Sequence, residues 1–178
     1  MSRLTLRYKP VYLDHSATTP VLPCVMKVIR AYTNAGNPAS IHRLGQRQKA
    51  KLDNARAKIA AYFNHAYHQV LFFASATEAN NYVLRSRMAA YSDTNQPYHC
   101  IIGATEHPCV YETAKYLESA GMALSIAPVT DTGHIDTHAL ADLIRPETKL
   151  ISVMMANNET GCIQPLSAIR DSITHHGL

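Results

Sequence analysis

The stretch that decides the fold is CIIGATEHPCVYETAKYLESAGMALSIA, residues 100–127. It begins with Cys100–Gly103, an apolar run of the length and composition of a buried strand. Residues Pro108–Ala120 follow with apolar side chains at helical spacing, and Gly121 is the residue type that most often ends a helix. A second apolar run, Ala123–Ala127, completes the unit. Strand, helix and strand in this order predict two parallel strands joined by a crossover helix.

The same alternation of short apolar runs and helical patterns continues on both sides of this unit. We expect strands at Val70–Phe73 and Leu150–Met155, and helices at Glu78–Tyr91, after the capping residue Asp136, and from Pro165 to a stop at Gly177. The sequence from about residue 66 onward therefore predicts an α/β layer with a mostly parallel sheet and covering helices.

The first 65 residues have a different character. Tyr8–Leu13 reads as a short strand or extended arm, and Pro20 suits the first turn of a helix. A long helix is expected next, with Ser40 as its N-cap and its end near Asn64. The predicted organisation is an N-terminal arm (1–19), a helical segment (20–65) and an incomplete α/β domain (66–178).

Composition places the chain among ordinary globular proteins. It has 178 residues, of which 47% are hydrophobic and 17% charged, which is enough to bury a sizeable core. The net charge is +4, and basic residues are densest between Arg43 and Lys58. The simplest interpretation is a solvated helix face. No zinc-finger, RNP or basic-zipper pattern supports nucleic-acid binding, so we expect no nucleic-acid partner.

The four cysteines form no C-x-x-C pair, so their spacing matches no zinc module and we expect no metal site. A chain of this size needs no disulfides, and we expect free thiols in a reducing compartment. No stretch reaches 18 consecutive apolar residues, which argues against a membrane partner. These observations together predict a cytoplasmic protein.

Polar segments follow three of the predicted strands, where an open parallel sheet binds its ligands. The first runs from Ala74 to Glu78 and opens a helix, where small residues and free backbone N–H groups let an anion approach closely, and Ser75 and Thr77 add hydroxyls. The alternative is ordinary N-capping by Ser75 or Thr77.

The second polar segment contains His107, directly before a helix. A histidine there can stack on a ring or shuttle a proton, and the alternative is a structural or solvated side chain. The third segment is Asn157–Gly161, whose amides and carboxylate suit a polar ligand, and the alternative is a simple turn. Together the three segments predict a crevice for a phosphate-bearing cofactor.

Five motifs in the chain resemble the class V aminotransferase family, and most closely its cysteine desulfurases. They run in the expected order and spacing: YLDHSATTP from Tyr12, NPASIHRLG from Asn37, ATE from Ala76, TEH from Thr105 and NNETG from Asn157. The resemblance extends from Tyr12 to the end of the chain. It implies a partial large domain of the fold type I pyridoxal-phosphate enzymes, plus an N-terminal arm and helices of the small domain.

The resemblance also implies roles for individual residues. Ala76 and Thr77 would bind the phosphate of pyridoxal 5′-phosphate, and His107 would stack on its ring and take part in proton transfer. Asn158 would donate a hydrogen bond to the phenolic oxygen. The implied reaction removes sulfur from L-cysteine, leaving L-alanine and an enzyme persulfide that feeds iron–sulfur cluster assembly or tRNA thiolation. The implied partners are a second copy of the complete enzyme and a sulfur-acceptor scaffold.

The chain departs from the family pattern in two ways. Ser75 stands where the family has glycine, which would crowd the phosphate turn. The family's cofactor-pairing aspartate, nearby glutamine, cofactor-binding lysine and sulfur-accepting cysteine all lie beyond the end of this sequence. We therefore expect the isolated chain to be an inactive, poorly stable N-terminal portion. The alternatives are another class V enzyme, such as a selenocysteine lyase, or a non-catalytic binding module.

Overall fold

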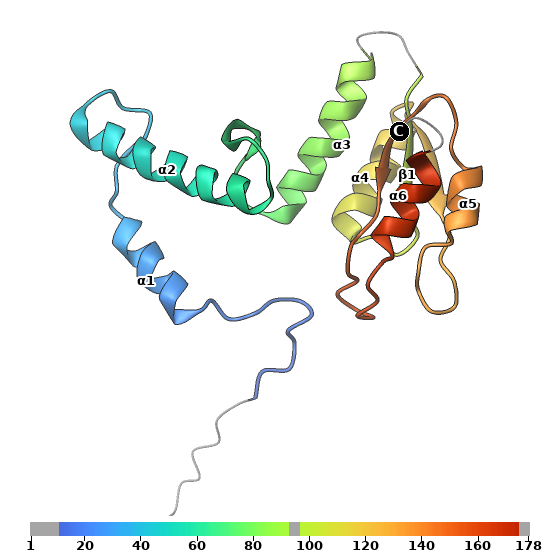
Figure 1. Cartoon of the computed structure of the whole chain (residues 1–178), viewed down its shortest axis with the longest axis horizontal. Coiled ribbons are helices and arrows are strands. Elements are labelled where there is room, and N and C mark those ends of the chain that lie inside the picture. Colours follow the sequence, from blue (N-terminus) through green and yellow to red (C-terminus); the bar gives the residue numbers. More distant parts are fainter. Residues whose placement is uncertain (1–10, 93–96, 175–178) are drawn as a thin grey trace, which may run out of the picture. The chain divides into compact units, whose positions relative to one another are not determined.

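The computed structural model describes residues 11–92 and 97–174 (Figure 1). The chain divides into two compact units, residues 1–72 and residues 73–178, and each is described by itself. In the described residues, no helix is both long enough and apolar enough to cross a membrane.

The C-terminal unit is built on a three-stranded parallel sheet in the order β2-β1-β3. The strands are β1 (His99–Gly103), β2 (Ala123–Ala127) and β3 (Thr148–Ser152). The prediction of a parallel α/β layer is therefore confirmed, and β2 has the expected bounds. Strand β3 begins and ends earlier than expected.

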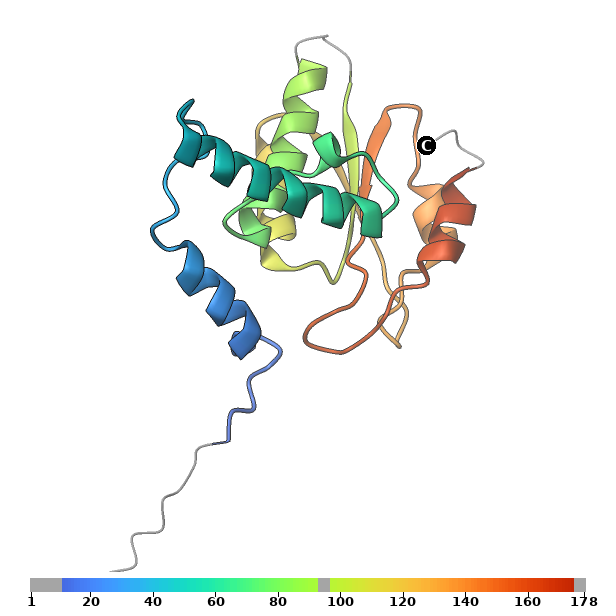
Figure 2. The same ribbon diagram turned by 60° about the vertical axis from the view of Figure 1, so that its left-hand side comes forward.

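Helices cover both faces of this sheet (Figure 2). They are α3 (Ala76–Ser92), α4 (Pro108–Ser119), α5 (Thr137–Asp142) and α6 (Leu166–Thr174). Because side chains alternate along a strand, Cys100 and Ile102 face one side and pack with Leu84 of α3 and Val110 of α4. On the other side, Ile101 packs with residues of α5 and α6. The unit is thus a three-layer sandwich with a core on each face.

A buried polar network ties the strands together near the start of β1. His99 is fully buried, and its Nδ1 lies 2.8 Å from Thr148 Oγ1 while its Nε2 lies 2.9 Å from Ser125 Oγ. The Arg145 guanidinium also donates to Ser125 Oγ, at 3.2 Å. Each of the three strands thus contributes a polar side chain to this network. Both imidazole nitrogens have a hydrogen-bond partner, as a buried ring requires.

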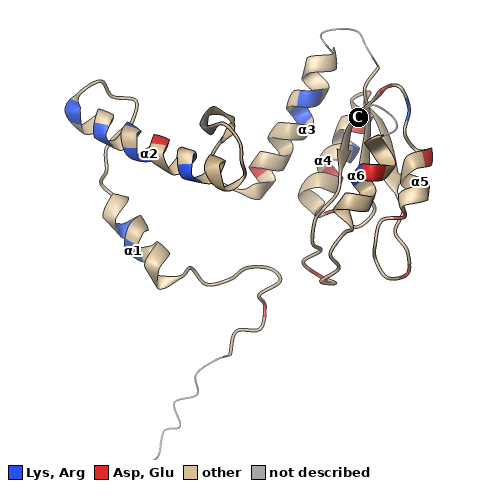
Figure 3. Ribbon diagram, viewed as in Figure 1, with Lys and Arg blue, Asp and Glu red and all other residues tan. Residues whose placement is uncertain are grey.

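The N-terminal unit consists of two helices, α1 (Pro23–Tyr32) and α2 (Arg43–Tyr62), and a 3-10 turn, η1 (Tyr67–Gln69). Among its described residues only Gly45 and Ala60 are buried. Lys and Arg outnumber Asp and Glu by eleven to two in residues 1–72, whereas the ratio is six to eleven in residues 73–178. Figure 3 shows the basic residues spaced along α2, where most of them are exposed as a solvated face requires.

Several predicted elements are wrong. Val70–Phe73 forms no strand, because its backbone pairs with none of the three strands, and Leu71 and Phe72 are exposed. Ser40 is not the N-cap of α2. His42 is, since its ring Nδ1 accepts the Gly45 N–H at 3.3 Å.

Other helix limits also differ from expectation. Helix α1 begins at Pro23 rather than near Pro20, and α3 begins at Ala76 rather than Glu78. Residues 11–13 of the predicted arm strand Tyr8–Leu13 are not a strand, and the rest of it lies outside the described residues. The predicted stop at Gly177 also lies outside them. Leu166, at the start of α6, is 42% exposed.

Candidate functional site

At the N-terminus of α3, side chains bond some of the backbone N–H groups and leave others available. Ser75 Oγ accepts the Glu78 N–H at 3.1 Å, and the Glu78 carboxylate accepts the Ala74 N–H at 2.8 Å. This reciprocal capping confirms the N-cap role of Ser75. In the described residues, no backbone hydrogen bond takes the N–H of Ala76 or Thr77, and both residues are exposed. These two donors therefore remain available to an anion at a helix start.

His107 is the N-cap residue of α4. Its Nδ1 accepts the Cys109 N–H at 3.1 Å, and Pro108 occupies the first helical position. An accepting Nδ1 places the ring proton of the neutral imidazole on Nε2. The cap thereby fixes both the orientation of this exposed ring and the nitrogen that carries its proton.

The segment Asn157–Gly161 is a tight turn organised by Asn157. The Asn157 side-chain oxygen accepts the N–H groups of Glu159 and Thr160, each at 2.9 Å. The turn is closed by a bond from the Gly161 N–H to the Asn157 carbonyl at 2.9 Å, with Gly161 at φ 72°. Asn158 is exposed on this turn, and its Nδ2 donates to Glu159 Oε1 at 3.3 Å.

Hydrogen bonds join the three segments to one another. The Asn80 amide in the second turn of α3 donates to Cys109 Sγ in the first turn of α4 at 3.2 Å. The Asn157 amide donates to the Thr105 carbonyl at 3.0 Å. The segment of His107 is therefore joined both to α3 and to the turn of Asn158, although the segment of Thr77 follows no strand.

Glu106 forms a second link between the loops after β1 and β3. One of its carboxylate oxygens accepts a hydrogen bond from the Met154 N–H. Burial raises the pKa of the Glu106 carboxyl, and the bond from Met154 partly opposes that shift. Glu106 thus joins the loop after β1 to the backbone that follows β3.

Comparison with known proteins agrees with this geometry. The model of the family described as aminotransferase class-V matches residues 11–178. The chain belongs to the class V aminotransferase family.

Relatives within this family are cysteine desulfurases. The mitochondrial cysteine desulfurase of Saccharomyces cerevisiae is 41% identical over 164 residues, which are 90% of this chain and 33% of that protein. A solved structure named NifS-like protein has a TM-score of 0.82 at 30% identity, with 92% of this chain and 46% of that chain covered. SspA in complex with cysteine has a TM-score of 0.84 at 28% identity, with 94% and 48% covered. This class V chain thus spans a third to a half of the length of these proteins.

Sequence reasoning missed two residues of the candidate site. Glu106 and Asn157 carry the hydrogen bonds between the loops, yet the sequence analysis gave a role to neither of them alone. An Asn-x-x-Thr-Gly pattern is a recognisable signal for an Asx turn. The partner carbonyl of Thr105 is distant in sequence and leaves no local signal.

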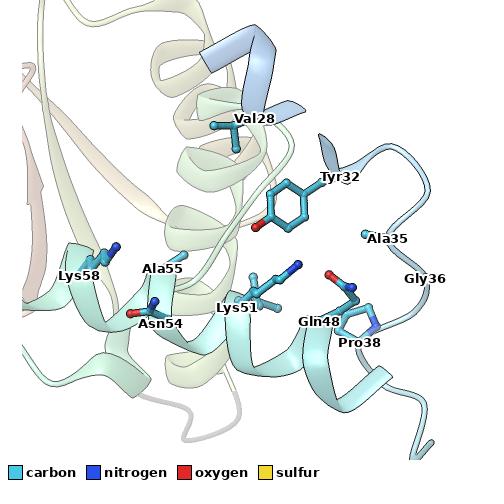
Figure 4. A pocket seen from close by; sticks show the side chains of 11 residues that line it. Val28, Tyr32, Ala35, Gly36, Pro38, Gln48, Lys51, Asn54, Ala55 and Lys58 are labelled. Carbon is cyan, nitrogen blue, oxygen red and sulfur yellow. The ribbon is translucent and has the colours of Figure 1, made fainter. Parts of the chain in front are cut away.

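A separate cavity of about 560 Å³ lies in the N-terminal unit, between α1 and α2 (Figure 4). Tyr32, Lys51, Leu52 and Lys58 are among the side chains that line it, and the Lys51 ammonium lies 4.7 Å from the centre of the Tyr32 ring. None of the predicted site residues lines this cavity, so we assign it no role in the candidate site.

Proposed function

We propose that this chain is the N-terminal portion of a cysteine desulfurase, and that Ala76, Thr77, His107 and Asn158 hold pyridoxal 5′-phosphate. The observation that carries the proposal is the adjacency of the three loops in a chain of the class V family. The cysteine desulfurase names of its relatives favour this reading over a selenocysteine lyase or a binding module.

The residues present fit the phosphate of this cofactor. The free N–H groups of Ala76 and Thr77 point from a helix start, where the positive end of the helix dipole favours an anion. The small side chain of Ala76 leaves the backbone accessible. The backbone of Ser75 is not in the left-handed conformation, and its hydroxyl accepts the Glu78 N–H. The serine therefore imposes no conformational strain here.

His107 and Asn158 would contact the ring. With its proton on Nε2, a His107 ring that stacks on the pyridine keeps a donor that can pass a proton to a reacting atom. The Asn158 amide would donate to the phenolic oxygen. The cofactor, when bound, supplies an electron sink, and these residues supply its position and its hydrogen-bonding environment.

The remaining assignments extend from the same proposal. The complete protein would remove sulfur from L-cysteine to give L-alanine and an enzyme persulfide, for iron–sulfur cluster or thionucleoside synthesis. It would act as a homodimer that passes sulfur to a scaffold protein. Residues 66–178 would belong to the large domain, and residues 1–19 and 20–65 to the arm and the small-domain helices. The four free thiols support a reducing compartment such as the cytoplasm.

Titration with pyridoxine 5′-phosphate tests the cofactor seat. This alcohol lacks the aldehyde that would react with surface lysines, so it reports only non-covalent binding. We expect saturable binding that is lost with pyridoxine, which has no phosphate. Ala76→Glu should weaken binding at least tenfold, because it places a carboxylate beside the phosphate. His107→Ala and Asn158→Ala should weaken it by smaller factors.

Ala57→Glu on α2 is the matched control for Ala76→Glu, because Ala57 is also an exposed helical alanine but lies outside the proposed seat. It should leave the affinity for pyridoxine 5′-phosphate unchanged. Equal affinity of the phosphate and pyridoxine forms, or equal loss in both glutamate variants, would contradict the proposal.

A further inference from the structure

We propose that Asn157 and Glu106 are positioning residues, which together clamp the loop of Asn158 against the loop of His107. The effect of this clamp on the cofactor rests on the proposed function above, whereas the clamp itself is a property of the chain alone. The inference concerns two side chains that we place outside direct contact with any ligand.

Both ends of the Asn157 side chain make hydrogen bonds inside the protein. Its oxygen accepts three hydrogen bonds, from the N–H groups of Glu159 and Thr160 and from Thr160 Oγ1 at 3.2 Å. Its amide nitrogen reaches across to the Thr105 carbonyl at 3.0 Å. One end of the side chain therefore shapes the turn that presents Asn158, and the other end fixes this turn to the loop before α4.

Glu106 makes a second link between the same loops, and here the side chain that crosses comes from the loop after β1. It leaves the loop after β1 and accepts the N–H of Met154, which precedes the Asn157 turn. A Cβ added to Gly103 would lie 3.3 Å from Glu106 Oε1 and 3.2 Å from Ile135 Cδ1, so a larger residue there would press on the carboxylate. The backbone of β1 thus leaves room for this side chain.

The two links flank the proposed ligand contacts in both loops. Thr105 and Glu106 directly precede His107, while Met154 and Asn157 lie on the approach to Asn158. Each loop contributes one side chain that bonds the backbone of the other loop, and the segment after β3 donates both hydrogen bonds. Two such links restrict sliding as well as separation of the loops. Because the second loop follows an edge strand, this clamp would hold the turn of Asn158 against the loop of His107.

Asn157→Asp tests the clamp without disrupting the turn, because it removes only the hydrogen bond to Thr105. At pH 7 the new carboxylate still accepts the N–H groups of Glu159 and Thr160, but it cannot donate to the Thr105 carbonyl and repels that oxygen. We expect the protection of the Met154 N–H against hydrogen exchange to fall about tenfold, with Glu159 and Thr160 protected as in the wild type. Near pH 4 the protonated carboxyl can donate again, and the difference should shrink.

Asn37→Asp is a matched control, because Asn37 Oδ1 accepts the Ala39 N–H at 2.8 Å in a similar turn of the N-terminal unit. It should leave the exchange of Met154 unchanged at both pH values. Asn157→Ala, which loses the turn as well, should raise exchange at Glu159 and Thr160. Unchanged Met154 exchange in Asn157→Asp, or a difference that does not depend on pH, would overturn the clamp.

Binding of pyridoxine 5′-phosphate separates this inference from the proposed function. If both are correct, Asn157→Asp also weakens binding about tenfold at pH 7 and less near pH 4. If the wild type does not bind while Met154 exchange responds as expected, the clamp stands and the cofactor proposal fails. If the wild type binds and Asn157→Asp changes neither exchange nor affinity, the cofactor proposal stands and the clamp fails.

Discussion

The two units of the chain differ in how they bury their apolar side chains. In residues 73–174 the sheet has a closed core on each face, with Ile101, Ile102 and Leu140 fully buried. In residues 11–72 the helices are regular, yet large apolar side chains such as Ile29 and Tyr62 are 51% and 84% exposed. The helices of residues 11–72 therefore leave much of their apolar surface uncovered, whereas the core of residues 73–174 is built from contacts between segments that are distant in sequence.

The largest expected effect tests whether this difference in burial is a difference in stability. Ile102→Ala removes a fully buried side chain between α3, α4 and the sheet, and should lower the free energy of unfolding by about 2–5 kcal/mol. Ile29→Ala, at a half-exposed position of α1, should change it by less than about 0.5 kcal/mol. Urea unfolding followed by circular dichroism measures both. Similar losses in the two variants would contradict the contrast between the units.

The next effect concerns pH and the buried imidazole of the C-terminal unit. Burial lowers the pKa of His99, and the nearby Arg145 lowers it further while Glu147 opposes the shift. The unfolded chain therefore binds the proton more readily than the folded chain. The stabilising contribution of neutral His99 is complete above its ordinary pKa of about 6.5 and is lost as the pH falls below it.

His99→Gln removes this titration and keeps hydrogen-bonding groups for Thr148 and Ser125. Between pH 6.5 and 5, the unfolding free energy of the wild type should fall more steeply, by up to about 1.4 kcal/mol per pH unit, than that of this variant. His65→Gln, at an exposed position of the N-terminal unit, should keep the wild-type slope. Parallel curves for wild type and His99→Gln would show that His99 does not contribute.

The smallest effect uses a matched pair of glycines. Gly121 at φ 102° ends α4, and Gly36 at φ 81° lies between α1 and α2, and an added Cβ would meet no atom within 4 Å at either position. Each alanine substitution thus adds only backbone strain, about 1–2 kcal/mol. Gly121→Ala should lower the midpoint of the cooperative unfolding transition and Gly36→Ala should not. A shift of the same size in both would mean that the two units unfold together.

The sequence predicted best those features that depend on neighbouring residues. The bounds of β2, the cap of α5 by Asp136, and Gly121 after α4 all follow from local patterns. Asp136 Oδ1, for example, accepts the N–H groups of His138 and Ala139, each at 3.0 Å.

The wrong predictions are of two kinds. Some required a choice between neighbouring residues that could fill the same role, and others depended on partners that are distant in the chain. Ser40 and His42 can both serve as an N-cap, and no neighbouring residue in the sequence excludes Ser40. In the structure the Ser40 carbonyl lies close to Gly45 of α2. Val70–Phe73 has the composition of a strand, but a strand also needs a neighbour, which composition does not supply. The order of β2, β1 and β3, and the bond from Asn157 to Thr105, likewise join residues that the sequence keeps apart.

The central claim is that the starts of α3 and α4 and the turn after β3 form a single seat for a phosphorylated pyridine. Hydrogen exchange of the whole chain, with and without saturating pyridoxine 5′-phosphate, tests it most directly. We predict that the ligand slows exchange in residues 75–79, 105–109 and 157–161 together, and leaves α1 and α2 unchanged. Slowing confined to the N-terminal unit, or to one of the three segments, would contradict the account.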